Sequence, residues 1–298
     1  FVGAQGTLGI ITQLTLQTEE HTPSSTLVVA YFNELQQAAK AIEELRSLPE
    51  SPSAMEMVDD HLLQMVDTIN PNLLKGVLDK PFPKLTLLIE FDESERSQKK
   101  LTKKAVKILE KHGADFEIEQ DPLRQEQLWR IRHSSATLAA HSEGGRRALP
   151  IIEDGIVPPE KFQEYVESVY ALFKKHRLPA ALWGHAGDAQ LHMQPFLDLS
   201  QVGDRQTALR LIDEYYNLVI SLGGSTSGQH NDGRLRAPYL EKLYGKQAYQ
   251  LFQQVKQIFD PYGTMNPGVK INVSLDDVKQ QLRTSYSMDH LYDHLPRS

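Results

Sequence analysis

The sequence predicts an α+β fold in which helices cover a mainly antiparallel sheet. Short apolar runs alternate along the chain with longer segments whose apolar residues recur at helical spacing. The chain has 298 residues, 40% of them hydrophobic, so it can bury one large core or two ordinary ones without disulfides. These observations are typical of a globular protein.

The elements follow from this alternation. The apolar run Leu27–Phe32 is a strand, and the segment after it repeats apolar residues at helical spacing. The same unit recurs twice, and two further helices come later. Predicted strands cover 27–32, 85–91 and 149–157, and predicted helices cover 34–48, 94–112, 159–175, 201–222 and 247–259. The polar residues after Asn272 indicate a C-terminal helix or linker, and short connections leave the strand order open.

The composition excludes several classes of function. Cysteine is absent, which removes disulfides, thiolate metal sites and cysteine nucleophiles. The net charge is -7 without any long basic block, so we expect a small-molecule partner and no nucleic acid. No apolar stretch is long enough for a transmembrane helix, and the expected location is cytoplasmic. The chain opens on Phe1 in a Gly-rich run without a partner strand nearby, which indicates a fragment of a longer protein.

The strongest local signal is the segment 183–192, in which His185 and His192 flank a Gly-Asp turn. Two imidazoles at this spacing converge if the turn folds back as a hairpin, and neutral imidazole is the commonest metal ligand of proteins. A divalent ion bound there would also hold an α-hydroxy acid. The alternative is a pair of histidines that only hydrogen-bond within the turn.

Two further segments carry polar groups suited to catalysis. Residues 223–236 combine small residues with His230, whose ordinary pKa suits proton abstraction. The same run also resembles a mobile loop. Arg130 and Arg132 cannot share one helix face, so one of them could point inward and clamp a carboxylate, whereas the alternative is a surface salt bridge. Asn266 lies in a turn after a helix stop.

Four of these segments, in this order, resemble one family. They are 1–12, 184–192, 228–230 and 260–270. Together they are similar to the FAD-linked oxidase family of D-lactate, glycolate and D-2-hydroxyglutarate dehydrogenases, from Phe1 to about Ile271. The resemblance implies that residues 1–22 are the last strands of an FAD-binding domain that lies mostly outside this chain. Residues 23–273 would be the ferredoxin-like C-terminal substrate domain, and residues 274–298 a tail or linker.

The resemblance also implies roles for single residues. FAD is expected to lie against Gly3, Gly6, Thr7, Gly9, Ile10 and Asn266. A divalent metal, Zn²⁺ or Mn²⁺, is expected on His185, His192 and Gln229. The residues expected at the substrate are His230 as the base, Arg132 for the carboxylate and Gln194 as a further contact.

The implied activity is oxidation of a 2-hydroxy acid to the 2-oxo acid, with hydride transfer to the flavin. Electrons would pass to a quinone, a cytochrome, an electron-transfer flavoprotein or an iron–sulfur protein. A homodimer and a peripheral association with a membrane are left open. The alternatives are a flavin oxidase of phenols or ether-lipid precursors, and a non-catalytic acid- or metal-binding module. The double-histidine motif favours hydroxy acids.

The sequence departs from the family pattern at three positions. Gln229 stands where the third metal ligand is a Glu, and a neutral amide oxygen is a weaker donor than a carboxylate. Ile152 and Ala136 replace a Lys and a Thr that contact substrate in the 2-hydroxyglutarate enzymes. Those two changes argue against 2-hydroxyglutarate as the substrate. Glu153 and Asp154 fit the wider family and are candidate partners of the metal or of His230.

Overall fold

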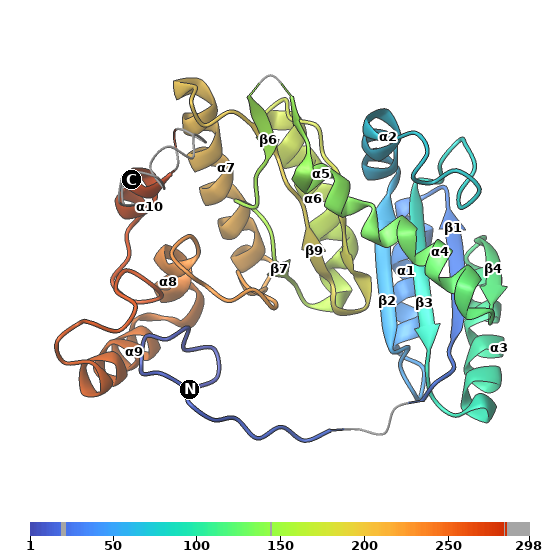
Figure 1. The fold of residues 1–298 in the computed structure, drawn as a ribbon, viewed down its shortest axis with the longest axis horizontal. Helices are drawn as coiled ribbons and strands as arrows, with labels where there is room; N and C mark the ends of the chain where they lie inside the picture. Colours follow the sequence, from blue (N-terminus) through green and yellow to red (C-terminus); the bar gives the residue numbers. More distant parts are fainter. Residues whose placement is uncertain (19–21, 144, 283, 285–298) are drawn as a thin grey trace, which may run out of the picture.

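A seven-stranded sheet dominates the computed structural model, which describes residues 1–18, 22–143, 145–282 and 284 (Figure 1). The strand order is β4-β1-β3-β2-β8-β9-β7, and each neighbouring pair is antiparallel. The strands are β1 Thr26–Phe32, β2 Ala54–Asp59, β3 Leu85–Phe91, β4 Asp115–Glu119, β7 Gly155–Ile156, β8 Trp183–His185 and β9 Gln190–His192. A second sheet, β10-β6-β5, is formed by Phe196–Leu197, Arg146–Ala148 and Ser142–Glu143. The prediction of an α+β fold with a mainly antiparallel sheet is confirmed.

Helices pack on both faces of the large sheet. They are α1 Leu35–Arg46, α2 Asp60–Ile69, α3 Glu95–Lys111, α4 Pro122–His133, α5 Ser135–Ala140, α6 Phe162–Lys175, α7 Val202–Ser221, α8 Leu240–Tyr244, α9 Lys246–Phe259 and α10 Leu275–Gln281. Short 3-10 turns cover Pro159–Lys161, Ala186–Asp188 and Ala237–Tyr239. Among the described residues no helix combines the length and the apolar character needed to cross a membrane.

Alternation along the strands creates two cores. In β1, Val28 and Phe32 face a core shared with α1, α3, α6 and α7. Leu27 and Val29 point to the opposite face and pack with α2 and α4. Successive strand residues point to opposite faces, so a strand buried on both sides reads as the continuous apolar run that the sequence displays.

Four strands and two helices form a ferredoxin-like unit. The order β4-β1-β3-β2, with α1 after β1 and α3 after β3, is the split β-α-β arrangement. Strand β2 then pairs with β8, with Glu56 opposite His185. The sheet therefore continues from the ferredoxin-like unit into the hairpin that carries the two motif histidines.

Most predicted elements are present, with one clear exception. The strand over 85–91 is confirmed, and the five predicted helices begin and end close to their predicted bounds. The strand predicted over 149–157 is wrong, because only Gly155–Ile156 is a strand. Pro150 has no N–H for a ladder, the N–H of Ile151 bonds back to Leu149, and Asp154 has a φ of 69°. The buried apolar residues there enter the core from turns.

The N-terminal segment lies against α9, far in sequence but adjacent in space (Figure 1). The strands expected over 1–22 are not formed by residues 1–18, and residues 19–21 lie outside the described part. The Nζ of Lys256 in α9 donates to the carbonyl of Thr7 at 2.7 Å, and the Phe1 and Phe259 rings meet edge to face at 5.2 Å between centroids. Most of the expected C-terminal tail, 285–298, also lies outside the described residues.

Candidate functional site

The hairpin β8–β9 brings His185 and His192 together. Trp183 pairs with His192 and His185 pairs with Gln190, which places the side chains of both histidines on one face. Their ring centroids lie 5.5 Å apart. The predicted convergence of the two imidazoles is confirmed.

Gly184 permits this tight hairpin. Its φ is 146°, and a Cβ on this residue would lie 2.6 Å from the carbonyl oxygen of Gln190. Only glycine fits such a close approach of two backbones.

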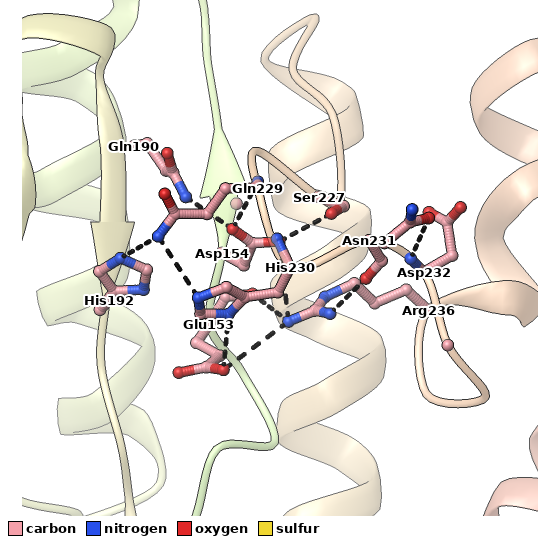
Figure 2. A network of polar contacts seen from close by, with 12 residues as sticks. Glu153, Asp154, Gln190, His192, Ser227, Gln229, His230, Asn231, Asp232 and Arg236 are labelled. Atoms are coloured by element: carbon pink, nitrogen blue, oxygen red, sulfur yellow. Dashed lines mark hydrogen bonds and ion pairs between the residues drawn. The ribbon is translucent and has the colours of Figure 1, made fainter. Parts of the chain in front are cut away.

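The carboxylate of Asp154 holds the loop 225–231 against the hairpin (Figure 2). One oxygen accepts from the side chain of Gln190 at 2.6 Å and the backbone N–H of Gln229 at 2.9 Å. The other accepts from the hydroxyl of Ser227 at 2.7 Å and the backbone N–H of His230 at 3.0 Å. Asp154 is fully buried, so four donors compensate for the loss of its hydration. The loop is therefore anchored and is not a free flexible segment.

Gln229 lies between two imidazoles (Figure 2). Its Nε2 is 3.3 Å from Nε2 of His192 and 3.3 Å from Nε2 of His230. The His192 and His230 rings stack with their centroids 5.2 Å apart and their planes 21° from parallel.

Glu153 contacts the outer side of His230. Its Oε1 lies 3.1 Å from Nδ1 of His230, and its backbone carbonyl accepts from Nη2 of the buried Arg236 at 3.3 Å. One donor atom each of Glu153, His192 and His230 lie within 4.8 Å of one another. This grouping differs from the set of His185, His192 and Gln229 that the sequence predicts for a metal.

Glu56, which the sequence reading did not identify, connects Arg132 to the hairpin. Its Oε2 accepts from Nε of Arg132 at 2.6 Å, and its Oε1 contacts Nδ1 of His185. Arg132 extends from α4 toward β2, and only 16% of its side chain is exposed. The inward arginine is therefore Arg132, in an ion pair that is largely buried. Arg132, Glu56, His185, His192, Gln229, His230 and Glu153 form one continuous series of contacts.

The two hairpin histidines have opposite electrostatic environments. The hydrogen bond to Glu56 raises the pKa of His185. Burial, together with the nearby His185 and Arg132, lowers the pKa of His192 to about 4. Burial favours a higher pKa for Glu56, but its contacts with His185 and Arg132 lower that pKa below the ordinary value. At neutral pH the site thus holds a neutral His192 beside a charged Arg132–Glu56 pair.

The residues predicted to bind FAD gather beside this site. Gly3 accepts from Nδ2 of Asn231 at 3.0 Å, and Nδ2 of Asn266 donates to the carbonyl of Gln5 at 2.5 Å. Gly6 and Gly9 have φ of 70° and 157°, with open space where a Cβ would be. Ile10 is 81% exposed. The N-terminal loop thus lies next to the segment after His230 and offers a surface free of side chains at two glycines. Contact with FAD itself stays a prediction.

Gln194 and Ile152, two positions that the sequence analysis relates to the substrate, differ in whether they present a polar group. Gln194 lies two residues beyond β9, and its buried Oε1 has no hydrogen-bond partner among the described residues. An unpaired buried acceptor is uncommon in a folded protein, and a water, an ion or a ligand can complete it. Ile152 is fully buried in the core, so this position presents no group to a substrate.

Comparisons with known proteins identify relatives along most of the chain. A family model described as FAD linked oxidases, C-terminal domain, matches residues 22–269. The mitochondrial D-lactate dehydrogenase [cytochrome] of Arabidopsis thaliana is 28% identical over 268 residues, covering 90% of this chain and 46% of the relative. The glycolate oxidase subunit GlcD of Bacillus subtilis is 25% identical over 278 residues, covering 90% and 55%. The chain spans about half the length of the curated relatives it matches.

Solved structures share the fold at lower identity. A 4-ethylphenol oxidase from Gulosibacter chungangensis superimposes with a TM-score of 0.60 at 14% identity, over 85% of this chain and 55% of that one. At this identity the likeness concerns the fold alone.

Proposed function

The chain belongs to the FAD-linked oxidase family, whose C-terminal domain it contains, and from this premise we propose that it is the substrate-binding part of a flavin-dependent 2-hydroxyacid dehydrogenase. The observation that carries the proposal is the single series of contacts that joins Arg132 to His230 through Glu56, His185 and His192. An arginine that can bind an anion and a histidine that can accept a proton are thus linked by side-chain contacts. Such a pair suits a substrate that has a carboxylate and a neighbouring hydroxyl.

Arg132 is proposed to bind the substrate carboxylate. Glu56 holds its Nε, so Nη1 and Nη2 remain as donors for the planar two-point contact that guanidinium makes with a carboxylate. Lysine would lose this geometry. The unpaired Oε1 of Gln194 is proposed to accept a hydrogen bond from the substrate.

His230 is proposed to take the hydroxyl proton. Glu153 lies against its Nδ1 and favours the tautomer with a proton there, which leaves the lone pair on Nε2. The substrate hydroxyl is proposed to replace the Gln229 amide, which contacts this atom at 3.3 Å. When Nε2 accepts the proton, the same carboxylate stabilises the imidazolium. The substrate loses this proton and, from the carbon, a second hydrogen with two electrons, and becomes the 2-oxo acid.

The flavin, when bound, supplies the acceptor for that carbon-borne hydrogen and electron pair. Gly3, Gly6, Thr7, Gly9, Ile10 and Asn266 are the residues of this chain proposed to lie against it. The final acceptor is proposed to be a quinone, a cytochrome, an electron-transfer flavoprotein or an iron–sulfur protein.

The metal set expected from the resemblance does not fit the donors present. An amide nitrogen of Gln229 is directed at Nε2 of His192, one of the two expected imidazole ligands, and at Nε2 of His230, so the expected amide ligand presents a donor where a metal needs a lone pair. No step proposed above is therefore routed through a metal.

Flavin bleaching tests the proposal directly. In the complete, flavin-loaded protein, one acid from a panel of D- and L-2-hydroxy acids is expected to reduce the flavin. We expect His230→Ala to slow this reduction by about 10²–10⁴-fold, the contribution of a positioned base. His112→Ala is the control, because His112 ends α3 and contacts Glu44.

Failure of every hydroxy acid to reduce a properly loaded flavin would reject the proposal. Reduction by phenols instead would favour the phenol-oxidase alternative.

A further inference from the structure

We infer that the side-chain amide of Gln229 takes the place of a cation in this site and bridges His192 and His230 through its NH₂ group. Binding of cations tests this inference, so it goes beyond the proposed function and does not depend on turnover.

The geometry places the amide where the two imidazoles converge. Nε2 of Gln229 is equidistant from Nε2 of His192 and Nε2 of His230, at 3.3 Å from each. The backbone N–H of Gln229 donates to Oδ1 of Asp154 at 2.9 Å, so the backbone from which this side chain extends is held in place. The two rings stack, and the Nε2 edge of each ring faces the amide.

The NH₂ group of Gln229 offers one hydrogen-bond donor to each of the two imidazoles. A carboxamide has two N–H donors on nitrogen and only acceptors on oxygen. Glu153 lies against Nδ1 of His230, which leaves Nε2 of that ring as an acceptor. His192 is 5% exposed, and burial favours its uncharged form with one nitrogen lone pair. With His192 in the tautomer protonated at Nδ1, two acceptors thus meet two donors, whereas the amide oxygen would face two lone pairs.

The charge balance favours the same arrangement. A divalent cation needs negative ligands to offset its charge, and residue 229 supplies none. The nearby carboxylate of Asp154 already accepts four hydrogen bonds. Glu153 is the remaining carboxylate, and it is directed at the Nδ1 edge of His230 and has an ion-pair contact with Arg236 at 3.9 Å. To bind a cation between Nε2 of His192 and Nε2 of His230, the site would have to break both Gln229 contacts.

Restoring a carboxylate at 229 tests the inference. Zn²⁺ affinity is measured by competition with a chromophoric chelator, and Co²⁺ binding by its visible absorption, on the complete protein and on Gln229→Glu, Gln229→Ala and Glu153→Gln. Gln229→His is a second gain-of-ligand variant in case the glutamate variant does not fold. Thermal unfolding verifies that each variant is native.

We expect weak Zn²⁺ binding by the wild type that Gln229→Ala leaves nearly unchanged. Gln229→Glu is expected to bind Zn²⁺ at least about tenfold more tightly, a gain no smaller than that from a supporting group around a metal ligand.

Three results would overturn the inference. Tight wild-type binding that Glu153→Gln weakens would assign the cation to Glu153, His192 and His230. Tight wild-type binding that Gln229→Ala weakens would make the amide oxygen a ligand. Equal, weak binding by the wild type and both gain-of-ligand variants would show that residue 229 does not determine occupancy.

Discussion

Glu56 is the residue on which the two ends of the candidate site depend. It is 8% exposed, and it contacts both Arg132 and His185. A buried carboxylate between an arginine and a histidine depends on both contacts, because each one offsets part of the desolvation of its charge. Glu56 therefore sets the position of the arginine and the protonation of the histidine together.

Neutralising this carboxylate should change the titration of His185. The folded-state pKa of His185 is raised by Glu56, so Glu56→Gln is expected to move that pKa down toward the ordinary value near about 6.5. A raised histidine pKa stabilises the folded state below the unfolded pKa, and this contribution disappears as the pH rises through the folded pKa. The variant should therefore lose less stability than the wild type as the pH rises above about 6.5.

NMR titration of the His185 ring measures the shift, and urea unfolding at several pH values measures the stability. Glu153→Gln is the matched control, since Glu153 contacts His230 and not His185. A His185 pKa that is the same in Glu56→Gln and wild type would contradict this role of Glu56.

Sequence reasoning found the histidines and missed Glu56 for a physical reason. His185 and His192 are marked by their spacing around a short turn, which is a local pattern. Glu56 is a single acidic residue in β2, a strand that runs into α2 at Asp60 without a turn residue between them. Its importance comes from pairing with β8, more than a hundred residues later, and this long-range contact leaves no local signal.

At the scale of elements, the β8–β9 hairpin determines whether the imidazoles meet. Gly184→Ala would place a Cβ 2.6 Å from the carbonyl of Gln190 in a backbone conformation with a φ of 146°. Strain of this kind costs about 1–3 kcal/mol, and the hairpin must open to relieve the overlap. We expect a loss of unfolding free energy of at least this size and weaker contact between the two rings.

Urea unfolding measures the loss, and ring-to-ring NMR contacts report the hairpin geometry. Gly203→Ala is the control, because a Cβ there meets no atom within 4 Å and the residue lies in α7, where alanine is favoured over glycine. An equal effect of the two substitutions would mean that the close approach at Gly184 is unimportant.

The elements themselves were predictable in proportion to their length and regularity. The five long helices and β3 follow from periodicity, because many residues contribute to each pattern. The segment 149–157 was misread, since Leu149, Ile151 and Ile152 are apolar like a strand but enter the core from turns held by tertiary contacts. The short strands β7, β8 and β9 have two or three residues each and are stabilised by their neighbours in the sheet.

At the scale of the molecule, the fold brings three distant segments to one place. The ferredoxin-like unit and the helix α4 that follows it supply Glu56 and Arg132, the hairpin extends the sheet, and the loop after α7 adds Gln229 and His230. The N-terminal loop reaches the same region from the other end of the chain, where the N–H of Gly233 donates to Oε1 of Gln5 at 2.9 Å. The N-terminal loop, which is predicted to contact the flavin, thus lies next to the loop that carries His230, which is predicted to contact the substrate.

Lys256 is expected to hold the N-terminal loop in this position. Its Nζ donates to the carbonyls of Thr7 at 2.7 Å and Met265 at 2.6 Å, and it pairs with Asp260 at 2.6 Å. Its side chain is 17% exposed, so methionine keeps the buried stem and removes only the charge and the donors. Lys256→Met should release the N-terminal loop while the sheet stays intact, since residues 1–9 contribute no strand to it.

Hydrogen exchange measures that release. The amide of Thr7, which bonds to Ala4 at 3.0 Å, is expected to exchange faster in Lys256→Met, whereas amides of β1 and β3 keep their protection. Lys100→Met, on the exposed face of α3, provides the matched loss of a surface charge. Unchanged protection at Thr7 would mean that the loop is fixed without the lysine, by the ring contact of Phe1 with Phe259 and by the hydrogen bonds that Gly3 and Gln5 form with Asn231, Gly233 and Asn266.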